Sequence, residues 1–554
     1  MSVELLSCTE FPAPFHPIAC AFAIDPVFCA ARFPTTANFR KDPAAALLNL
    51  RPPLPQPHTE RLCRALRESM DGLELTASQL RYLQALQSGS ALAVTTGQQV
   101  GFLGGPLYTA LKAAAALALA QQLQEVLQRP IVPIFWVEDN DSDGREAGSS
   151  VWWQPDGTLQ RLAAASDAEL LQPIAVSARS LSPTGLWQTA LRHILPELSD
   201  ELRSIVLTAY SYGKSWSQAF VVLLHWLFGS SGLLFLRASV ARRRRLFCSI
   251  VQWALFQSSQ LEAALAKGIQ QLRALGYREL ITPQHPLVHF HTPEGFRYRV
   301  RYLPSGEYGI ARERYTIQQL SALFEQECTA FSPSALLRPL CQDAILPTVA
   351  VVLGPAEVAY WAQLRELYEA LQVPMPAVML RPSVTLVPPQ LHRLLVQEGW
   401  SVRDFFAPWQ AVERILLERL PPTQLLEHSS SKLQTQLQQW YQHLLAHLWE
   451  IDPTLVPSLG ATHHRIAQAL QRWQRRFRAA LRRRSETLLS RARRVWSLVY
   501  PNGHPQERLM SWLQLLALCG RSAFQEALVH ATALPSGHHA ILTLAPSSEP
   551  STAD

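Results

Sequence analysis

The feature of this sequence that most restricts its fold is a unit of apolar strand, glycine, proline and helix that occurs twice. In the first copy, Ala91–Val94 is followed by the glycine-rich loop Thr95–Gly105 and by a helical pattern that begins at Pro106. In the second copy, Thr348–Leu353 leads through Gly354-Pro355 into another helical pattern. Apolar strands that alternate with helices are typical of a parallel sheet covered by helices. The sequence therefore predicts an α/β fold with a mostly parallel sheet.

A chain of 554 residues is too long for one ordinary core, so several folding units are expected. Further strands of the sheet are predicted at Ile131–Val137, Gly232–Leu236 and Pro376–Leu380. We expect the sheet and its helices to form a core over residues 1–390, with insertions near 145–210 and 240–330.

Residues 391–500 are predicted to form a helical coiled-coil domain. Apolar residues recur at helical spacing from Leu433 to Leu448 and again from Ile466 to Val495. Two long amphipathic helices in succession indicate an antiparallel hairpin or coiled coil. The last segment, 501–554, returns to mixed structure, and we expect it to pack back on the core.

Composition and cysteine placement favour a soluble protein of the cytoplasm. The formal charge of +7 is mild for this length and does not by itself require a nucleic acid or a membrane as a partner. The eight cysteines include no CxxC pair, which suits a reducing compartment better than a disulfide framework. The N-terminus lacks the order of a signal peptide, and the apolar run Ala219–Phe228 is too short to span a bilayer. We therefore expect no membrane partner.

Both glycine–proline turns are candidates for binding an anionic ligand. Each helix start offers unpaired N–H groups and a partial positive charge, and glycine lets a ligand approach the backbone closely. If both strands belong to one parallel sheet, both helix starts face one crevice at its carboxyl edge. Gln98 and Gln99 add donors and acceptors for hydroxyl or amide groups. Either turn alone is equally consistent with a tight strand-to-helix connection that binds no ligand. Glu357 is likewise consistent with a residue that only stabilises the helix dipole.

An acidic loop follows the predicted strand Ile131–Val137. Its carboxylates are Glu138, Asp139, Asp141 and Asp143. The spacing copies the start of an EF-hand calcium loop, but the twelfth position is Ser150 and a strand precedes the loop. Carboxylates at the carboxyl end of a strand favour a general base or a Mg²⁺ site instead.

Two other patterns are weaker. The alternation His289-x-His291 could place two imidazoles on one face of a strand, but no third ligand is evident, which favours a structural or surface role. The arginine-rich stretch Arg472–Arg494 would suit nucleic acid, although its apolar seam indicates packing with the arginines as a solvated face.

Several longer motifs resemble one known family. They are Thr96–Tyr108, Pro133–Asp139, Phe331–Leu340, Gln342-Asp343, Gly354–Tyr360 and Pro501-Asn-Gly503 with Gln506-Glu-Arg508. In this order, over nearly the whole chain, they resemble the cysteine-adding enzymes of bacillithiol biosynthesis. The resemblance implies a Rossmann-like, nucleotidyltransferase-type core with inserted connecting segments and a C-terminal antiparallel coiled coil, usually in a homodimer.

The resemblance also implies an activity. The carboxyl group of L-cysteine would be joined to the amine of glucosaminyl-malate through an amide bond, the last step of bacillithiol biosynthesis. A free carboxylate needs activation, so ATP or another phosphoryl or adenylyl donor is expected, and ATP or ADP is the implied nucleotide ligand.

Site residues follow from these motifs. The expected catalytic residues are the four carboxylates of the acidic loop. The expected substrate-binding residues are Thr96, Gln98, Gln99, Gly101, Gly104, Gly105, Arg338, Asp343, Gly354, Glu357 and Tyr360. In the family a nucleotide can sit near the coiled coil, where the expected contacts are Asn502, Gly503 and Arg508. No residue is assigned to a metal, and whether the reaction needs one is left open.

Two alternatives stay open at this point. One is a related amino-acid-activating or nucleotidyl-transferring enzyme with another acceptor. The other is a nucleic-acid-binding protein that uses the arginine-rich hairpin, whose affinity would fall steeply with salt.

Overall fold

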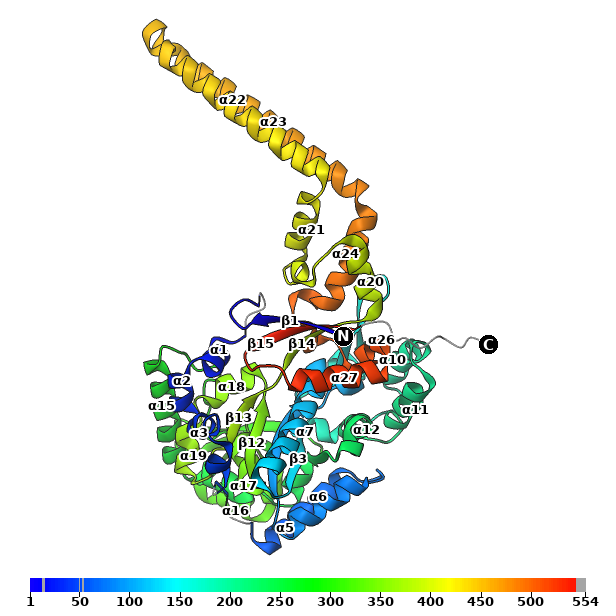
Figure 1. Cartoon of the computed structure of the whole chain (residues 1–554). Helices are drawn as coiled ribbons and strands as arrows, with labels where there is room; N and C mark the ends of the chain where they lie inside the picture. Colours follow the sequence, from blue (N-terminus) through cyan, green and yellow to red (C-terminus); the bar gives the residue numbers. More distant parts are fainter. Residues whose placement is uncertain (12–14, 49, 52–53, 545–554) are drawn as a thin grey trace, which may run out of the picture. The chain divides into compact units, whose positions relative to one another are not determined.

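The computed structural model describes residues 1–11, 15–48, 50–51 and 54–544, and the chain divides into two compact units (Figure 1). Unit 1 holds Met1–Trp153, Leu159–His392 and the chain from Pro505 onward. Unit 2 holds Gln154–Thr158 and Arg393–His504. In the described residues, no helix combines the length and apolar character that a membrane crossing needs.

The core of unit 1 is a five-stranded sheet in which every neighbouring pair is parallel. Its strands, from one edge to the other, are β13 (Ala377–Leu380), β12 (Thr348–Leu353), β2 (Leu92–Gln99), β3 (Ile131–Glu138) and β6 (Leu234–Arg237). Numbered along the chain, these strands have the order 3-2-1-4-5 from β6 to β13, which matches the doubly wound Rossmann order 3-2-1-4-5-6 without its sixth strand. The predicted α/β, Rossmann-like fold is confirmed.

Strand β2 is longer than the sequence pattern indicated. The polar residues Thr95–Gln99 were expected in a loop, but they pair with β3 on one side, and Thr95 and Thr96 also pair with β12 on the other. Two buried hydroxyl groups are satisfied there: Thr95 Oγ1 accepts from Gln342 Nε2 at 3.0 Å, and Thr96 Oγ1 donates to the Val352 carbonyl at 2.9 Å. Hydrogen bonding removes the cost of burying these polar side chains inside the sheet.

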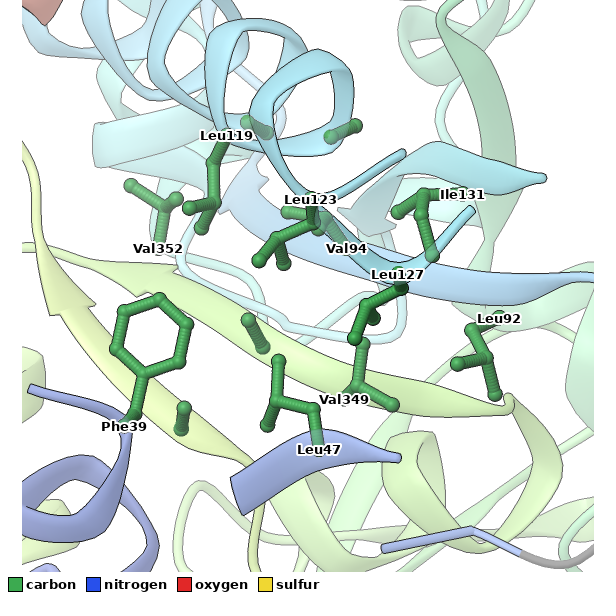
Figure 2. Packing of buried hydrophobic residues seen from close by; sticks show 14 residues of the cluster. Phe39, Leu47, Leu92, Val94, Leu119, Leu123, Leu127, Ile131, Val349 and Val352 are labelled. Carbon is green, nitrogen blue, oxygen red and sulfur yellow. The ribbon is translucent and has the colours of Figure 1, made fainter. Parts of the chain in front are cut away.

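Helix α7 (Leu107–Leu127) packs across the sheet and closes part of its core (Figure 2). Its side chains Leu119, Leu123 and Leu127 join a buried cluster with strand residues such as Val94 and Val352. Full burial of a leucine contributes roughly 1.5–3 kcal/mol, so this cluster is a main source of stability. Pro106 is the residue that precedes the helix rather than its first residue, because its ψ of 161° is extended.

The second predicted helix is two helices, α18 (Pro355–Trp361) and α19 (Arg365–Ala370). Two smaller sheets complete unit 1 around the core. The first is antiparallel, with the strand order β10 (Glu313–Tyr315), β9 (Tyr308–Ile310), β8 (Arg297–Tyr302), β7 (Val288–His291) and β11 (Phe331–Pro333). The second places β15 (His538–Thr543) between β1 (Ser2–Ser7) and β14 (Ser383–Val387). The predicted hairpin is formed by β4 (Ser149–Trp153) and β5 (Leu159–Ala163).

Further helices of unit 1 surround these sheets. They include α1 (Pro17–Ile24), α2 (Pro26–Arg32), α3 (Pro34–Phe39), α4 (Pro43–Leu47), α5 (Gln56–Ser69), α6 (Ala77–Gln87), α10 (Trp187–Ile194), α11 (Asp200–Ala209), α12 (Trp216–Phe228), α13 (Ala238–Arg243), α14 (Cys248–Phe256), α15 (Ser258–Ala274), α16 (Ile317–Glu327), α17 (Arg338–Ile345), α26 (Trp512–Cys519) and α27 (Arg521–Thr532).

One pair of cysteines is bonded. Cys248, at the start of α14, forms a disulfide with Cys328, and the other six cysteines are free. The sequence favoured reduced cysteines because it contains no close pair, but 80 residues separate these two and the fold brings them together.

Unit 2 is helical. Helices α22 (Pro421–Ile451) and α23 (Val456–Arg484) run antiparallel beside each other, and α21 (Trp409–Glu418) and α24 (Glu486–Val499) belong to the same unit (Figure 1). Arg478 of α23 pairs with Glu427 of α22 at 3.4 Å. The predicted antiparallel coiled coil is confirmed.

Candidate functional site

A cavity of about 840 Å³ opens in unit 1 at the carboxyl ends of three sheet strands. Its floor includes Gln98 and Gln99 of β2, Glu138 of β3 and Gly354, which follows β12. The chain order of the strands reverses between β2 and β12, and crevices at such a switch point are where open α/β sheets bind ligands. The volume suits a small-molecule ligand of metabolite or drug size.

Lys112 connects three elements that line the cavity. It lies on α7, is 2% exposed, and donates from Nζ to the Gly97 carbonyl at 2.8 Å and to Gln98 Oε1 at 2.9 Å. The same ammonium group forms an ion pair with Glu357 of α18. Burial lowers the pKa of Lys112, and the Glu357 carboxylate opposes that shift. One cation thus fixes β2, α7 and α18 around the ligand space.

Two of the four predicted catalytic carboxylates face this cavity. Glu138 accepts from Trp136 Nε1 at 2.9 Å, and burial raises the pKa of Glu138 while Arg338 opposes the rise. Asp141 pairs with Arg297 at 2.8 Å and also accepts from Gln99 Nε2.

The other two carboxylates of the acidic loop hold the backbone. Asp139 is fully buried and accepts from the Ser239 backbone N–H at 2.8 Å and from its hydroxyl at 2.7 Å, which fixes the start of α13. Asp143 caps the short helix α8 (Gly144–Ala147) by accepting from the Glu146 N–H at 2.9 Å. Neither lines the cavity.

The end of the predicted glycine-rich loop, from Gly101 to Gly105, is folded against protein rather than against the ligand space. A Cβ on Gly101 would lie 2.5 Å from the Gly105 Cα, and a Cβ on Gly104 would lie 2.4 Å from Trp512 Nε1. Gly104 and Gly105 also have φ values of +85° and +76°, which favour glycine. These three glycines do not line the cavity, so their requirement comes from packing.

The remaining predicted substrate-binding residues divide in the same way. Arg338, Gly354, Glu357 and Tyr360 line the cavity together with Gln98 and Gln99. Arg338 donates to Tyr360 Oη at 3.2 Å. Thr96 and Asp343 do not line it: both are buried, and Asp343 accepts from Tyr368 Oη at 2.6 Å.

The three predicted nucleotide contacts fall in different units. Asn502 and Gly503 belong to unit 2, whereas Arg508 belongs to unit 1 and lines its cavity. In the described part of the chain, the guanidinium groups of Arg508 and of Arg299, which also lines the cavity, have no hydrogen-bond or ion-pair partner. Both are therefore available to an anionic ligand.

Several cavity residues were not predicted as site residues, among them His289, for which a structural or surface role was expected. They are Tyr108, Lys112, Glu146, His289, Arg297, Arg299, Arg381 and Glu507. A signal existed for Lys112, which is the one basic residue in the 21-residue, mainly apolar helix α7. No comparable signal marked Arg381, and although Glu507 lies within the motif Gln506-Glu-Arg508, nothing indicated that the two side chains pair at 2.8 Å across 126 residues.

The two histidines of β7 (Val288–His291) have different surroundings. His291 hydrogen-bonds Ser332 Oγ at 2.7 Å and is buried. His289 lines the cavity, where burial and the charges of Arg297 and Arg299 lower its pKa to about 2. The imidazole of His289 is therefore neutral at physiological pH. Among the described residues, no three His, Cys, Asp or Glu side chains are grouped as metal ligands.

Comparison with known proteins gives matches over most of the chain. The family model described as Bacillithiol biosynthesis BshC, N-terminal Rossmann-like domain, matches residues 24–382. The model described as Bacillithiol biosynthesis BshC, C-terminal coiled-coil domain, matches residues 384–544.

Individual relatives cover similar lengths. A protein of Chlorobaculum tepidum is 29% identical over 486 residues, which cover 84% of this chain and 85% of that protein. A protein of Solibacter usitatus is 30% identical over 439 residues, with 79% and 82% covered, and one of Staphylococcus epidermidis is 26% identical over 479 residues, with 84% and 87% covered. Each of the three is named "Putative cysteine ligase BshC".

Proposed function

Because this chain belongs to the BshC family of bacillithiol biosynthesis, we propose that it is a ligase that adds L-cysteine to glucosaminyl-malate. The bond formed is the amide between the cysteine carboxyl group and the sugar amine. The observation that carries the proposal is the match of both family models, one after the other, to residues 24–382 and 384–544.

The cavity of unit 1 offers the groups that such substrates need. Arg299, Arg338 and Arg508 have no carboxylate bonded to them and can pair with the carboxylates of a malate group. Gln98 and Gln99 line the same cavity and can bond the sugar hydroxyls. Glu138 supplies a negative charge for an amino group. These assignments rest on the chemistry of the side chains and on their common cavity.

Amide formation from a free carboxylate also requires activation. The co-substrate we propose is a nucleoside triphosphate such as ATP. Its phosphoryl or adenylyl group is transferred to an oxygen of the cysteine carboxylate. When the amine attacks the carboxyl carbon, that oxygen departs together with the phosphate-bearing group. Arg508 is the predicted nucleotide contact that this proposal retains, because its free guanidinium group can pair with a phosphate. The homodimer stays a prediction.

A gene deletion in the host tests the proposal in the cell. Loss of the ligase should remove the cysteine-bearing thiol and cause glucosaminyl-malate to accumulate, which mass spectrometry of the small-molecule pool measures. Complementation with the intact gene should restore the thiol. An unchanged thiol pool in the deletion strain would contradict the proposed function.

A further inference from the structure

Glu146 differs from the other carboxylates of the cavity in having no partner. Its neighbours in the cavity are all engaged: Glu138 accepts from Trp136, Asp141 pairs with Arg297, Glu357 with Lys112 and Glu507 with Arg381. Within the described ranges, the Glu146 carboxylate has no hydrogen bond and no ion pair. It lines the cavity and keeps part of its surface exposed.

Local structure holds Glu146 in this place. The Asp143 side chain accepts from the Glu146 backbone N–H at 2.9 Å, which fixes the first turn of α8. Gly144 packs so closely that a Cβ there would lie 2.5 Å from the Leu170 carbonyl oxygen. Helix α8 is thereby held against α9 (Asp167–Leu170). The acidic loop that follows β3 thus ends by presenting Glu146 to the cavity.

Charges from three elements face the Glu146 carboxylate. The negative charges of Asp143 and Asp141, in the loop before α8, repel the Glu146 carboxylate. The positive charges of Lys112 on α7 and of Arg508 on α25 (Gln506–Leu509) attract it. The Tyr108 phenol of α7 is close enough for the Glu146 charge to raise its pKa, an effect second to burial.

These surroundings set the protonation of the carboxyl group. Desolvation, followed by repulsion from Asp143 and Asp141, raises the pKa of Glu146 to about 7. A carboxylate with a pKa near the working pH is suited to accept and release a proton within one turnover.

We propose that Glu146 is the general base that removes the proton from the attacking amine of the acceptor. This inference rests on the proposed ligase function. The amine nitrogen attacks the activated carboxyl carbon of cysteine, the C–N bond forms, and the bond from that carbon to the phosphate or adenylate oxygen breaks. One N–H proton passes to a Glu146 carboxylate oxygen and then to solvent. No redox change occurs, and the phosphate-bearing group leaves with the electron pair of the broken bond.

The test compares E146Q with the wild-type enzyme in two reactions. In the first, cysteine, glucosaminyl-malate and ATP are supplied, and the amide product is measured across pH. In the second, hydroxylamine replaces the acceptor and traps activated cysteine as a hydroxamate. Hydroxylamine is weakly basic, so the proton that its nitrogen must lose after attack passes readily to water without a base from the protein. E125Q is the matched control, since Glu125 is an exposed residue of α7 outside the cavity.

We expect E146Q to lower kcat for the amide about 10²–10⁴-fold, which is the usual contribution of a general base. Wild-type kcat should rise with pH through an apparent pKa near 7, and E146Q should lose that rise. E146D should keep part of the activity. Hydroxamate formation, the melting temperature of E146Q and all activities of E125Q should match the wild type.

Three results would overturn the assignment. An E146Q enzyme with wild-type kcat and pH profile would overturn the base role and leave the ligase function intact. Equal loss of amide, hydroxamate and thermal stability would mark Glu146 as structural. A wild-type enzyme that forms neither product would contradict the proposed function itself, and the base role with it.

Discussion

Replacing Glu507 with glutamine is expected to destabilise unit 1 by about 3–5 kcal/mol, because it leaves a buried guanidinium group without its counter-charge. Glu507 and Arg381 are each 4% exposed in the ion pair, and their atoms approach to 2.8 Å. The Glu507 carboxylate also accepts from the Val384 N–H at 2.7 Å and from Ser383 Oγ at 3.1 Å. This carboxylate therefore links the chain after Pro505 to β14 through hydrogen bonds.

The magnitude follows from what glutamine can replace. Its single amide oxygen can accept from Val384 or from Arg381, and its NH₂ group then faces the other donor. A lost hydrogen bond to a charged group costs about 1.5–3 kcal/mol, and the unpaired buried charge brings the total to the upper range. Arg381→Met combined with E507Q removes both charges, so it should cost less than the sum of the single changes.

The dependence on pH has a definite sign. Burial opposes ionisation, but Arg381, His539 and the Val384 N–H together hold the pKa of Glu507 below its usual range. Its contribution is therefore present above the unfolded-state pKa of about 4.3 and is lost as the pH falls through the lower folded-state pKa. The difference between wild type and E507Q should be constant near neutral pH and should shrink in acid.

Hydrogen exchange of the β14 amides in a urea series measures this directly. An opening free energy lower by about 3–5 kcal/mol corresponds to roughly a hundredfold to several-thousandfold faster exchange. E369Q is the matched control, because Glu369 is 55% exposed in an i,i+4 pair with Arg365 and its loss should cost below about 0.5 kcal/mol. A cost for E507Q as small as that of E369Q would show that the buried pair with Arg381 contributes little to stability.

Two further substitutions test the site and its scaffold. Glu138→Gln should lower kcat by about 10²–10³-fold, the usual effect of losing one preorganised electrostatic group, with an unchanged melting temperature; unfolding would instead mark Glu138 as structural. Gly104→Ala should lower the melting temperature more than Gly520→Ala, although both glycines have positive φ, because a Cβ at position 104 would meet the Trp512 ring whereas position 520 has nothing within 4 Å. Equal losses from the two alanines would show that the contact with the ring is unimportant.

The sequence predicted the sheet and the edge at which the cavity opens. The repeated strand, glycine, proline and helix unit predicted a mostly parallel sheet and left open whether both copies belong to it. The structure shows that β2 and β12 are neighbours in one sheet, at the switch in strand order. The pattern underestimated the length of β2, because polar residues such as Thr95 and Thr96 are typical of a loop. They are buried in the strand because Gln342 and the Val352 carbonyl hydrogen-bond their hydroxyl groups. Such partners are distant in sequence and leave no local pattern.

The site was predicted less completely for two physical reasons. The position of a residue after a strand does not determine which way its side chain points. Asp139 and Glu138 were therefore predicted to have the same role, although Asp139 bonds Ser239 and Glu138 lines the cavity. Contacts between distant segments could not be predicted either, as with the ion pair of Arg381 and Glu507. Glu146 was not predicted, because the catalytic carboxylates were expected only up to Asp143, whereas Asp143 proves to be a helix cap and Glu146 lines the cavity.

The most direct test of the account is the reaction itself with purified full-length protein. Incubation with L-cysteine, glucosaminyl-malate and ATP should give a product with the mass of the two substrates less one water, and the product should require all three components. Tandem mass spectrometry should locate the new bond between the cysteine carbonyl and the sugar nitrogen. Absence of that amide from an enzyme that is folded and supplied with all three components would contradict the central claim.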